Sequence, residues 1–387
     1  MNFRILKQNA TQYGMFVALM AVMIFFTVTT GGIFMTPRNL SNLFDQTGYV
    51  AVLAIGMTLI LIIRQIDLSV GFAAGFIGAI SALVMRNFPG IPVVFIVIGA
   101  MLIGLCIGLY QGKLVSKFGV PAFVVTLAGM FIFRGALLRV TEGTGTIIVK
   151  KEVFNALGNG FIPDIFGKGG MHILTIVLGL LLIVYLLVSE FLNRKKRAKY
   201  QLQDLPLDMF IYKLIFISAL IFFFSWKIAN YNGLSWTVVI VIAVLAVYHF
   251  FTNNTVLGRH IYAVGGNPEA AELSGISVQK ITTFVFCSMG TLAGLAGILF
   301  TARLQSATTT AGNAFEMDAI ASCYVGGVSA SGGVGRVTGT IIGALVMSAL
   351  SNGMNLMNIG ISYQYMVRGA VLILAVLFDV RARRMKV

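Results

Sequence analysis

The chain has 387 residues, of which 58% are hydrophobic and only 11% charged, and its formal net charge is +15. A charged share this low is less than half that of a typical soluble domain, so a soluble globular protein is excluded. The cysteines lie singly in apolar runs at Cys106, Cys287 and Cys323, a pattern that indicates neither a disulfide framework nor a metal knuckle. We therefore expect an integral membrane protein.

Continuous apolar runs recur along the chain, each close to the roughly 20 residues that a helix needs to cross a bilayer. They lack the alternation of transmembrane β-strands, so we predict an all-α polytopic bundle of about twelve spans. The expected spans centre on 14–30, 48–63, 70–85, 91–112, 121–138, 171–189, 210–226, 234–251, 281–301, 318–328, 337–355 and 363–378. The tenth is short, and we expect it to be broken or re-entrant.

Cations cluster beside the ends of the spans, as the positive-inside rule describes, and not along a soluble face. One side would carry Arg4, Lys7, Lys113, Lys117, the basic run 193–199, Arg259, Lys280 and the basic run 381–386. The other side would keep a weaker set, namely Arg38, Arg86, Arg139, Lys150, Lys151, Lys168 and Lys227. We predict that the first side is cytoplasmic and holds both termini.

Several enzyme signatures are missing from the sequence. It contains no G-x-x-x-x-G-K-[ST] loop for ATP, no G-x-S-x-G serine elbow and no H-E-x-x-H spacing among His172, His249 and His260. The stretch "GGVGRVTG" at 332–339 has the wrong spacing for a dinucleotide site. We expect no catalytic residues, no bound metal and no cofactor.

A few polar residues interrupt the apolar runs and need a reason, because a charge at the centre of a membrane helix costs about 2.5 to 3.5 kcal/mol. Asp67, Arg134 and Arg368 are the main ones. In "RQIDLSVG", a helix that ends near Arg64 and a new one capped by Asp67 or Ser69 would form a broken pair. This break is either a plain cap at the cytoplasmic boundary or part of a transport path, for which Asp67, Ser69 and Arg134 are the candidates.

Small residues recur at four-residue or similar spacing in three segments, which predicts close helix packing. The glycines are Gly71, Gly75 and Gly78, then Gly290, Gly294 and Gly297, then Gly335, Gly339 and Gly343. The sequences "IGAISALVM" at Ile77 and "IGALVMSAL" at Ile342 resemble each other. They indicate an internal repeat, unless low complexity alone makes them similar.

The polar stretch 258–277 between two apolar spans predicts a short capped helix. Asn267 suits the N-cap, Pro268 the first helical position, Glu269 and Glu272 the early turns, and Gly275 the stop. Helices this short barely form alone in water, so this one should pack on something. Its own membrane domain and a groove on a cytoplasmic partner are the two alternatives.

The segments "GRHIYAVGGNPEAAELSGISVQKI", "AGLAGILFTARLQSATTTAGNAFEMDAIASCYVGGVSASGGVGRVTGTIIGALV" and "IDLSVG" together resemble the permease subunit of monosaccharide ABC importers, the ribose, galactose and xylose class. In that family the cytoplasmic loop forms the coupling helix that docks on the ATPase. The resemblance implies coupling positions at Gly265, Gly266, Asn267, Pro268, Glu269, Ala270, Ala271 and Glu272. It also implies a second permease copy, a cytoplasmic ATPase with two nucleotide-binding domains, an extracytoplasmic sugar-binding protein and the bacterial inner membrane.

Two departures from the family pattern stand out. Arg64 and Gln65 precede "IDLSVG" where members usually carry glycine. Residues 191–233 look like an inserted hairpin within a single transmembrane domain, 1–387, whose coupling loop is 252–280. The hairpin is similar to the xylose and multiple-monosaccharide subgroup, which implies import of aldoses such as xylose, galactose or arabinose.

The outer loops are expected to meet the binding protein, with Arg303, Gln305, Asn313 and Glu316 as docking candidates. A proton-coupled secondary sugar transporter is the alternative function, and it would need a buried titratable carboxylate, for which Asp67 is the fair candidate. A channel or membrane scaffold is a third possibility, which leaves the capped cytoplasmic helix without a role.

Overall fold

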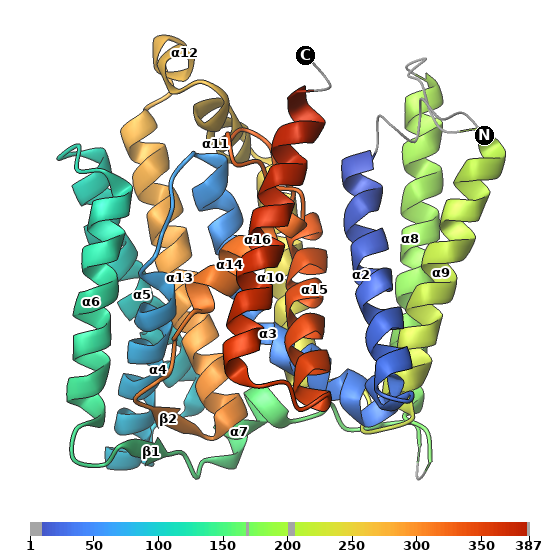
Figure 1. The fold of residues 1–387 in the computed structure, drawn as a ribbon, viewed down its shortest axis with the longest axis horizontal. Helices are drawn as coiled ribbons and strands as arrows, with labels where there is room; N and C mark the ends of the chain where they lie inside the picture. The colour runs from blue at the N-terminus through green and yellow to red at the C-terminus, as the bar shows by residue number, and fades with distance from the viewer. Residues whose placement is uncertain (1–9, 168–169, 200–205, 385–387) are drawn as a thin grey trace. The chain divides into compact units, whose positions relative to one another are not determined.

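A computed structural model describes residues 10–167, 170–199 and 206–384. Arg4, Lys7, Lys168 and part of the predicted hairpin, 200–205, lie outside these ranges. The described chain is almost entirely helical (Figure 1). Two short strands, β1 (Thr146–Ile148) and β2 (Ser306–Thr308), form an antiparallel ribbon in which Ile147 faces Ala307.

The helices follow one another with short connections. The first part of the chain forms α2 (Ala10–Thr29), the 3-10 turn η1 (Ile33–Met35), α3 (Pro37–Ile62), α4 (Val70–Asn87), α5 (Val93–Ser116), α6 (Ala122–Thr141), α7 (Glu152–Asn159), α8 (Ile173–Lys199) and α9 (Leu207–Ala229). The rest forms α10 (Trp236–Asn254), α11 (Val256–Gly266), α12 (Pro268–Leu273), α13 (Val278–Leu304), α14 (Phe315–Val325), α15 (Val337–Leu356) and α16 (Ile361–Arg384).

Within the described residues, 10 helices are long and apolar enough to cross a membrane, and the all-α polytopic prediction is confirmed. Two of the expected spans fall outside this set. The first is α2, for which the stretch Gly14–Thr29 is the part described with its side chains. The other is α14, whose 11 residues make about 16 Å of helix. That length is too short to cross a bilayer, as expected for the tenth span.

The chain divides into two compact units, and the smaller consists of residues 35–42 and 161–235. Inside it, α8 and α9 lie side by side and are joined by an ion pair of 3.0 Å between Lys213 and Glu190. At the other end of this helix pair, Nε2 of His172 lies at hydrogen-bond distance, 2.8 Å, from the carbonyl oxygen of Ile162. The predicted hairpin falls in this unit, and its status as an insertion stays a prediction.

The larger unit contains the remaining helices, and its core is built on direct backbone contact. A methyl group added at Gly104 of α5 would lie 2.0 Å from the carbonyl oxygen of Gly290 in α13. One added at Gly297 of α13 would lie 2.2 Å from the carbonyl oxygen of Ala74 in α4. Only glycine permits so close an approach, so the predicted small-residue packing is present here.

Two stretches of the larger unit have the same plan in opposite directions (Figure 1). α3 runs toward the end that carries α12, residues 63–69 return part-way, and α4 leads away from that end. α13 starts at the α12 end, residues 309–314 return, and α14 points back toward α12. The structural counterparts are therefore α4 and α14. The similar sequences at Ile77 and Ile342 lie in α4 and α15, so they do not mark this correspondence.

Candidate functional site

The helices α4 and α14 begin against each other, and we call residues 67–71 with 311–318 the half-helix junction. A Cβ added at Gly71 would lie 2.4 Å from both the carbonyl oxygen of Gly312 and Oε2 of Glu316. One added at Gly75 would lie 2.4 Å from the carbonyl oxygen of Ala311. The first turn of α4 thus packs on the segment that leads into α14, with no space for a side chain between them.

The start of α4 is held by one side chain close in sequence and by one from α5. Oδ1 of Asp67 accepts hydrogen bonds from the Ser69 N–H at 2.9 Å and from its hydroxyl at 2.7 Å. Nε2 of Gln111 in α5 donates to the Ser69 hydroxyl oxygen at 2.8 Å. All three side chains are buried. The backbone places Ser69 at the cap position of α4, but the side-chain acceptor at this end is the carboxylate of Asp67. Of the two cap candidates, Asp67 therefore supplies the hydrogen bonds.

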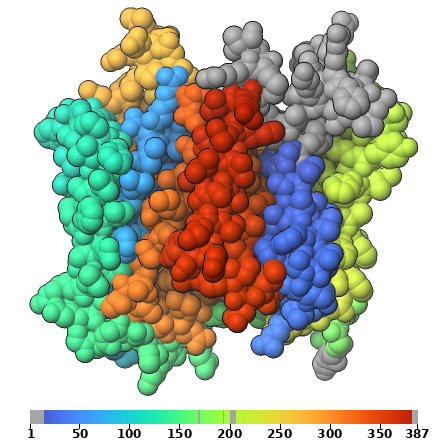
Figure 2. Space-filling model, viewed as in Figure 1, coloured from blue at the N-terminus to red at the C-terminus, as the bar shows by residue number. Residues whose placement is uncertain are grey.

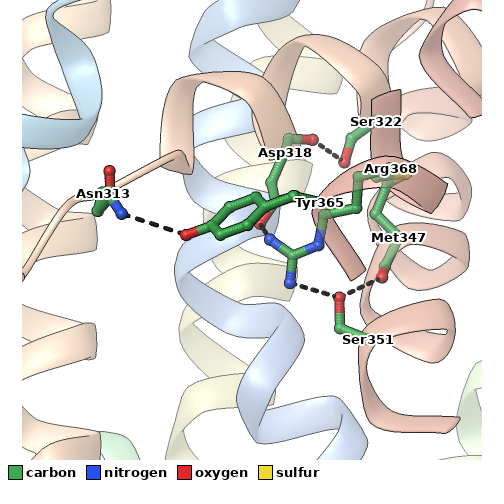
Figure 3. Close-up of polar contacts among 7 residues, drawn as sticks. All are labelled: Asn313, Asp318, Ser322, Met347, Ser351, Tyr365 and Arg368. Carbon is green, nitrogen blue, oxygen red and sulfur yellow. Dashed lines mark hydrogen bonds and ion pairs between the residues drawn. The ribbon is translucent and has the colours of Figure 1, made fainter. Parts of the chain in front are cut away.

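The start of α14 is held differently, because its cap residue, Ala314, has no side chain able to accept a hydrogen bond. Ala314 also has φ +62, a left-handed conformation that is unfavourable for a residue with a Cβ. Nη1 of Arg368 in α16 donates a hydrogen bond to Oδ2 of Asp318, in the first turn of α14, at 3.0 Å (Figure 3). A contact between helices, and not a local cap, therefore fixes this end.

The ion pair belongs to a network that joins α14, α15 and α16 (Figure 3). Nη2 of Arg368 donates to the hydroxyl oxygen of Ser351 at 2.8 Å, and that hydroxyl donates to the carbonyl of Met347 at 3.0 Å. One turn away on α16, the Tyr365 hydroxyl accepts from Nδ2 of Asn313 at 3.2 Å. The residues ahead of α14 and within its first turn are both tied to α16.

Three carboxylates are buried at the junction, since Asp67, Glu316 and Asp318 are 2%, 7% and 6% exposed. Oε2 of Glu316 and Oδ1 of Asp318 accept no hydrogen bond from the part of the chain that the structure describes. In that same part, no group of three or more His, Cys, Asp or Glu side chains could hold a metal ion. The junction thus contains buried carboxylate oxygens without a hydrogen-bond donor among the described residues.

The path candidates are only partly brought together. Asp67 and Ser69 lie in the junction, whereas Arg134 is exposed on α6, with its guanidinium carbon 5.6 Å from the centre of the Phe72 ring. The sequence analysis did not link Asp318 with Arg368. Opposite charges in two of the expected apolar spans were the available signal, because a lone charge at that depth needs a partner.

The predicted short capped helix is present as α12, which has six residues and projects from one end of the larger unit (Figures 1 and 2). Oδ1 of Asn267 accepts from the Ala270 N–H at 3.1 Å, and the carbonyl of Asn267 accepts from the Ala271 N–H at 3.0 Å. Gly275 follows with φ +83. The expected N-cap and stop residues are confirmed.

The coupling positions divide between two faces. Gly265 and Ala271 face the protein: a Cβ at Gly265 would lie 1.9 Å from the carbonyl oxygen of Ile62, and Ala271 is 4% exposed. Gly266, Asn267, Glu269, Ala270 and Glu272 are exposed, and Pro268 is half-buried. Leu273, which the sequence analysis passed over, is 91% exposed at the tip. The sequence signal for this exposed position was an apolar residue, Leu273, at the end of an otherwise polar helix.

The opposite end of the larger unit carries a shallow groove. It has a volume of ≈ 490 Å³ and is lined by Ile148, Val149, Lys150, Glu152, Asn155, Ala156, Asn159, Gly160 and Gln305. Nδ2 of Asn159 donates to the carbonyls of Ala302 and Arg303, so the α13 end supports the groove. Of the docking candidates, Gln305 lines the groove, Asn313 is exposed beside Tyr365, and Glu316 is buried in the junction.

Comparison with known proteins identifies the class. A family model described as a branched-chain amino acid transport system / permease component matches residues 39–376. The chain belongs to this permease family. The xylose transport system permease protein of Haemophilus influenzae is 36% identical, over 97% of this chain and 98% of its own. The Escherichia coli K12 ribose import permease protein is 35% identical, over 92% of this chain and 90% of its own.

These relatives confirm the resemblance to monosaccharide ABC importer permeases. The permease is a sugar ABC transporter subunit and, with 10 helices of spanning length among the described residues, a multi-pass protein of the inner membrane. No solved structure matches the chain.

Proposed function

We propose that the permease imports xylose-type aldoses, driven by a separate cytoplasmic ATPase with two nucleotide-binding domains and supplied by an extracytoplasmic sugar-binding protein. The names of the xylose and ribose permeases that align along most of the chain support the substrate class. The chain itself contains no P-loop, so ATP has to bind a partner.

The observation that carries the proposal is the exposed tip of α12. A six-residue helix is too short to persist alone, but here Ala271 anchors it while Glu269, Glu272 and Leu273 point outward. An anchored helix with an apolar end suits a groove on another protein, in the helix-in-groove manner. The ATPase would receive this surface, and conformational change there would reach the membrane through α11.

The proposed orientation puts α12 and both termini in the cytoplasm. Lys113, Lys117, Arg259 and Lys280 lie near helix ends or turns at the end of the larger unit that carries α12. An excess of Lys and Arg marks cytoplasmic loops, which supports this assignment. The groove lined by Gln305 would then face the binding protein.

A second copy of the permease completes the proposed assembly. One binding protein and two nucleotide sites are best served by matched permease copies around a two-fold axis. The half-helix junction, with Asp67 and Ser69, is the proposed lining of the path, and Arg134 on exposed α6 is a further candidate.

Reconstitution tests the proposal. The purified chain alone in liposomes should bind no ATP and take up no sugar. Adding the tandem ATPase and the binding protein should give xylose uptake that needs ATP. Uptake by the lone chain in response to a proton gradient would contradict the proposal and favour the proton-coupled secondary transporter.

A further inference from the structure

Arg64 stands where a helix normally ends in glycine. The Arg64 N–H donates to the carbonyl of Leu61 at 3.0 Å, and the Gln65 N–H donates to the carbonyl of Ile60 at 3.0 Å. This pair of bonds is the Schellman ending of a helix, whose left-handed position favours glycine. Arg64 has φ +62 and accepts the strain of its Cβ. A residue placed there against its backbone preference is expected to contribute through its side chain.

The side chain reaches the end of α11, immediately before the docking helix. Nε of Arg64 donates to the carbonyl of Gly265 at 2.7 Å, and Nη2 donates to the carbonyl of Gly266. These are the last carbonyls of α11, where a cation is favoured by the helix dipole. The planar fork of arginine holds both carbonyls in one orientation, which the single ammonium of lysine cannot do.

The region around Arg64 and α11 is bonded both to the segment before α4 and to the segment after α14. Arg64 begins the segment that leads to Asp67, three residues farther on, and then to the start of α4 at Val70. The Gly333 N–H, on the segment that follows α14, donates to the carbonyl of Ile62 at 2.9 Å. The Tyr262 hydroxyl in α11 donates to the carbonyl of Gly335 at 2.8 Å. The end of α11 is therefore bonded to the chain before α4 and to the chain after α14.

We propose that Arg64 is a positioning residue that carries movement of the ATPase-docking helix α12 to the segment that opens α4. This inference rests on the proposed function and names the residue through which the coupling acts. The Tyr262 hydroxyl, bonded to the carbonyl of Gly335, holds α11 independently of Arg64. Loss of the guanidinium should therefore uncouple transport without releasing α12 from the protein.

The experiment uses the full complex of permease, ATPase and binding protein in liposomes. Three variants are compared with wild type: Arg64→Gly, which relieves the backbone and removes both bonds, Arg64→Lys, which keeps the charge, and the control Gln65→Ala. The side chain of Gln65 makes none of the bonds described above. Dimer assembly, ATPase capture, thermal stability, ATP hydrolysis with and without loaded binding protein, and xylose uptake are all measured.

For Arg64→Gly we expect intact assembly, unchanged or raised thermal stability and basal ATP hydrolysis, with uptake per ATP hydrolysed lower by about tenfold, within the usual range of coupling. Arg64→Lys should recover part of the loss, and Gln65→Ala should match wild type. Wild-type uptake per ATP in Arg64→Gly would overturn the inference, and so would loss of assembly or stability, which would make Arg64 a structural cap. Absence of uptake by the wild-type complex would instead refute the proposed function, and the inference with it.

Discussion

The helices α4 and α14 both begin at the half-helix junction, but the structure holds their ends by different means. α4 is capped by Asp67, two residues ahead of its cap position, and supported by Gln111 of the adjacent α5. α14 has a strained alanine at its cap and depends on Arg368 from the far C-terminal helix. The start of α4 is held by a side chain close in sequence together with a contact from α5, and that of α14 by a contact between helices without a side-chain cap. We therefore expect α14 to be the one whose position can be released.

The largest effect is expected from Arg368→Ala. It leaves the buried Asp318 without its partner, and breaking such a pair costs about 3 to 5 kcal/mol. Thermal unfolding in detergent should shift strongly downward, and uptake should be lost. The double variant Asp318→Asn with Arg368→Gln should lose much less, because neither group is then left as an unpaired charge. Equal losses in the single and double variants would show that the pair does not hold α14.

Gly71→Ala tests the contact between the two helices. The added methyl would lie 2.4 Å from the carbonyl oxygen of Gly312, so one backbone must move, at a cost of about 1 to 3 kcal/mol. The melting temperature and the uptake rate should both fall. Gly99→Ala on α5, where nothing lies within 4 Å of the new atom, is the matched control and should behave as wild type. A silent Gly71→Ala would mean that the junction is looser than described.

Asp67→Ala removes the local cap of α4. The Ser69 N–H and hydroxyl lose their acceptor, which costs about 1 kcal/mol for a typical cap. Stability should fall modestly, measured by thermal unfolding in detergent. Asp67→Asn keeps Oδ1 as an acceptor and should retain most of the stability. If Asp67→Asn is as damaging as Asp67→Ala, the charge of Asp67 matters more than the cap.

Tyr365→Phe should have the smallest effect. Tyr365 is exposed on α16, and the change removes the one hydrogen bond between its hydroxyl and Asn313. Such a bond contributes about 0.5 to 1 kcal/mol at most. Uptake should stay near wild type, and any change in the unfolding midpoint should be slight. A loss comparable to that of Arg368→Ala would show that Asn313, and not Asp318, anchors α14.

Much of this fold follows from local sequence. Runs of apolar residues predicted the spans, and the pattern from Asn267 to Gly275 predicted α12 with its cap and stop. Both depend on neighbours in the chain, which a sequence displays directly. The half-helix at 315–325 was also expected, because its apolar run is too short.

Contacts between segments far apart in the chain could not be predicted from the sequence in this way. Asp318 and Arg368 are 50 residues apart, and Arg64 lies 201 residues before Gly265. Which face of α12 is outward also depends on packing, so the sequence alone did not show that Ala271 is buried and Leu273 exposed. Pairings of this kind are fixed by tertiary structure, and a single sequence supplies only their charge and spacing.

The central claim is that α12 couples the permease to an ATPase, and Ala271→Pro tests it most directly. Proline removes the N–H that bonds the Asn267 carbonyl at 3.0 Å and clashes with the preceding turn, at about 3 kcal/mol or more. The membrane helices should be unaffected. In liposomes containing the complete importer, ATP-dependent xylose uptake should vanish for Ala271→Pro, while Ala271→Ser stays near wild type and both variants assemble as dimers. Wild-type uptake by Ala271→Pro would contradict the account.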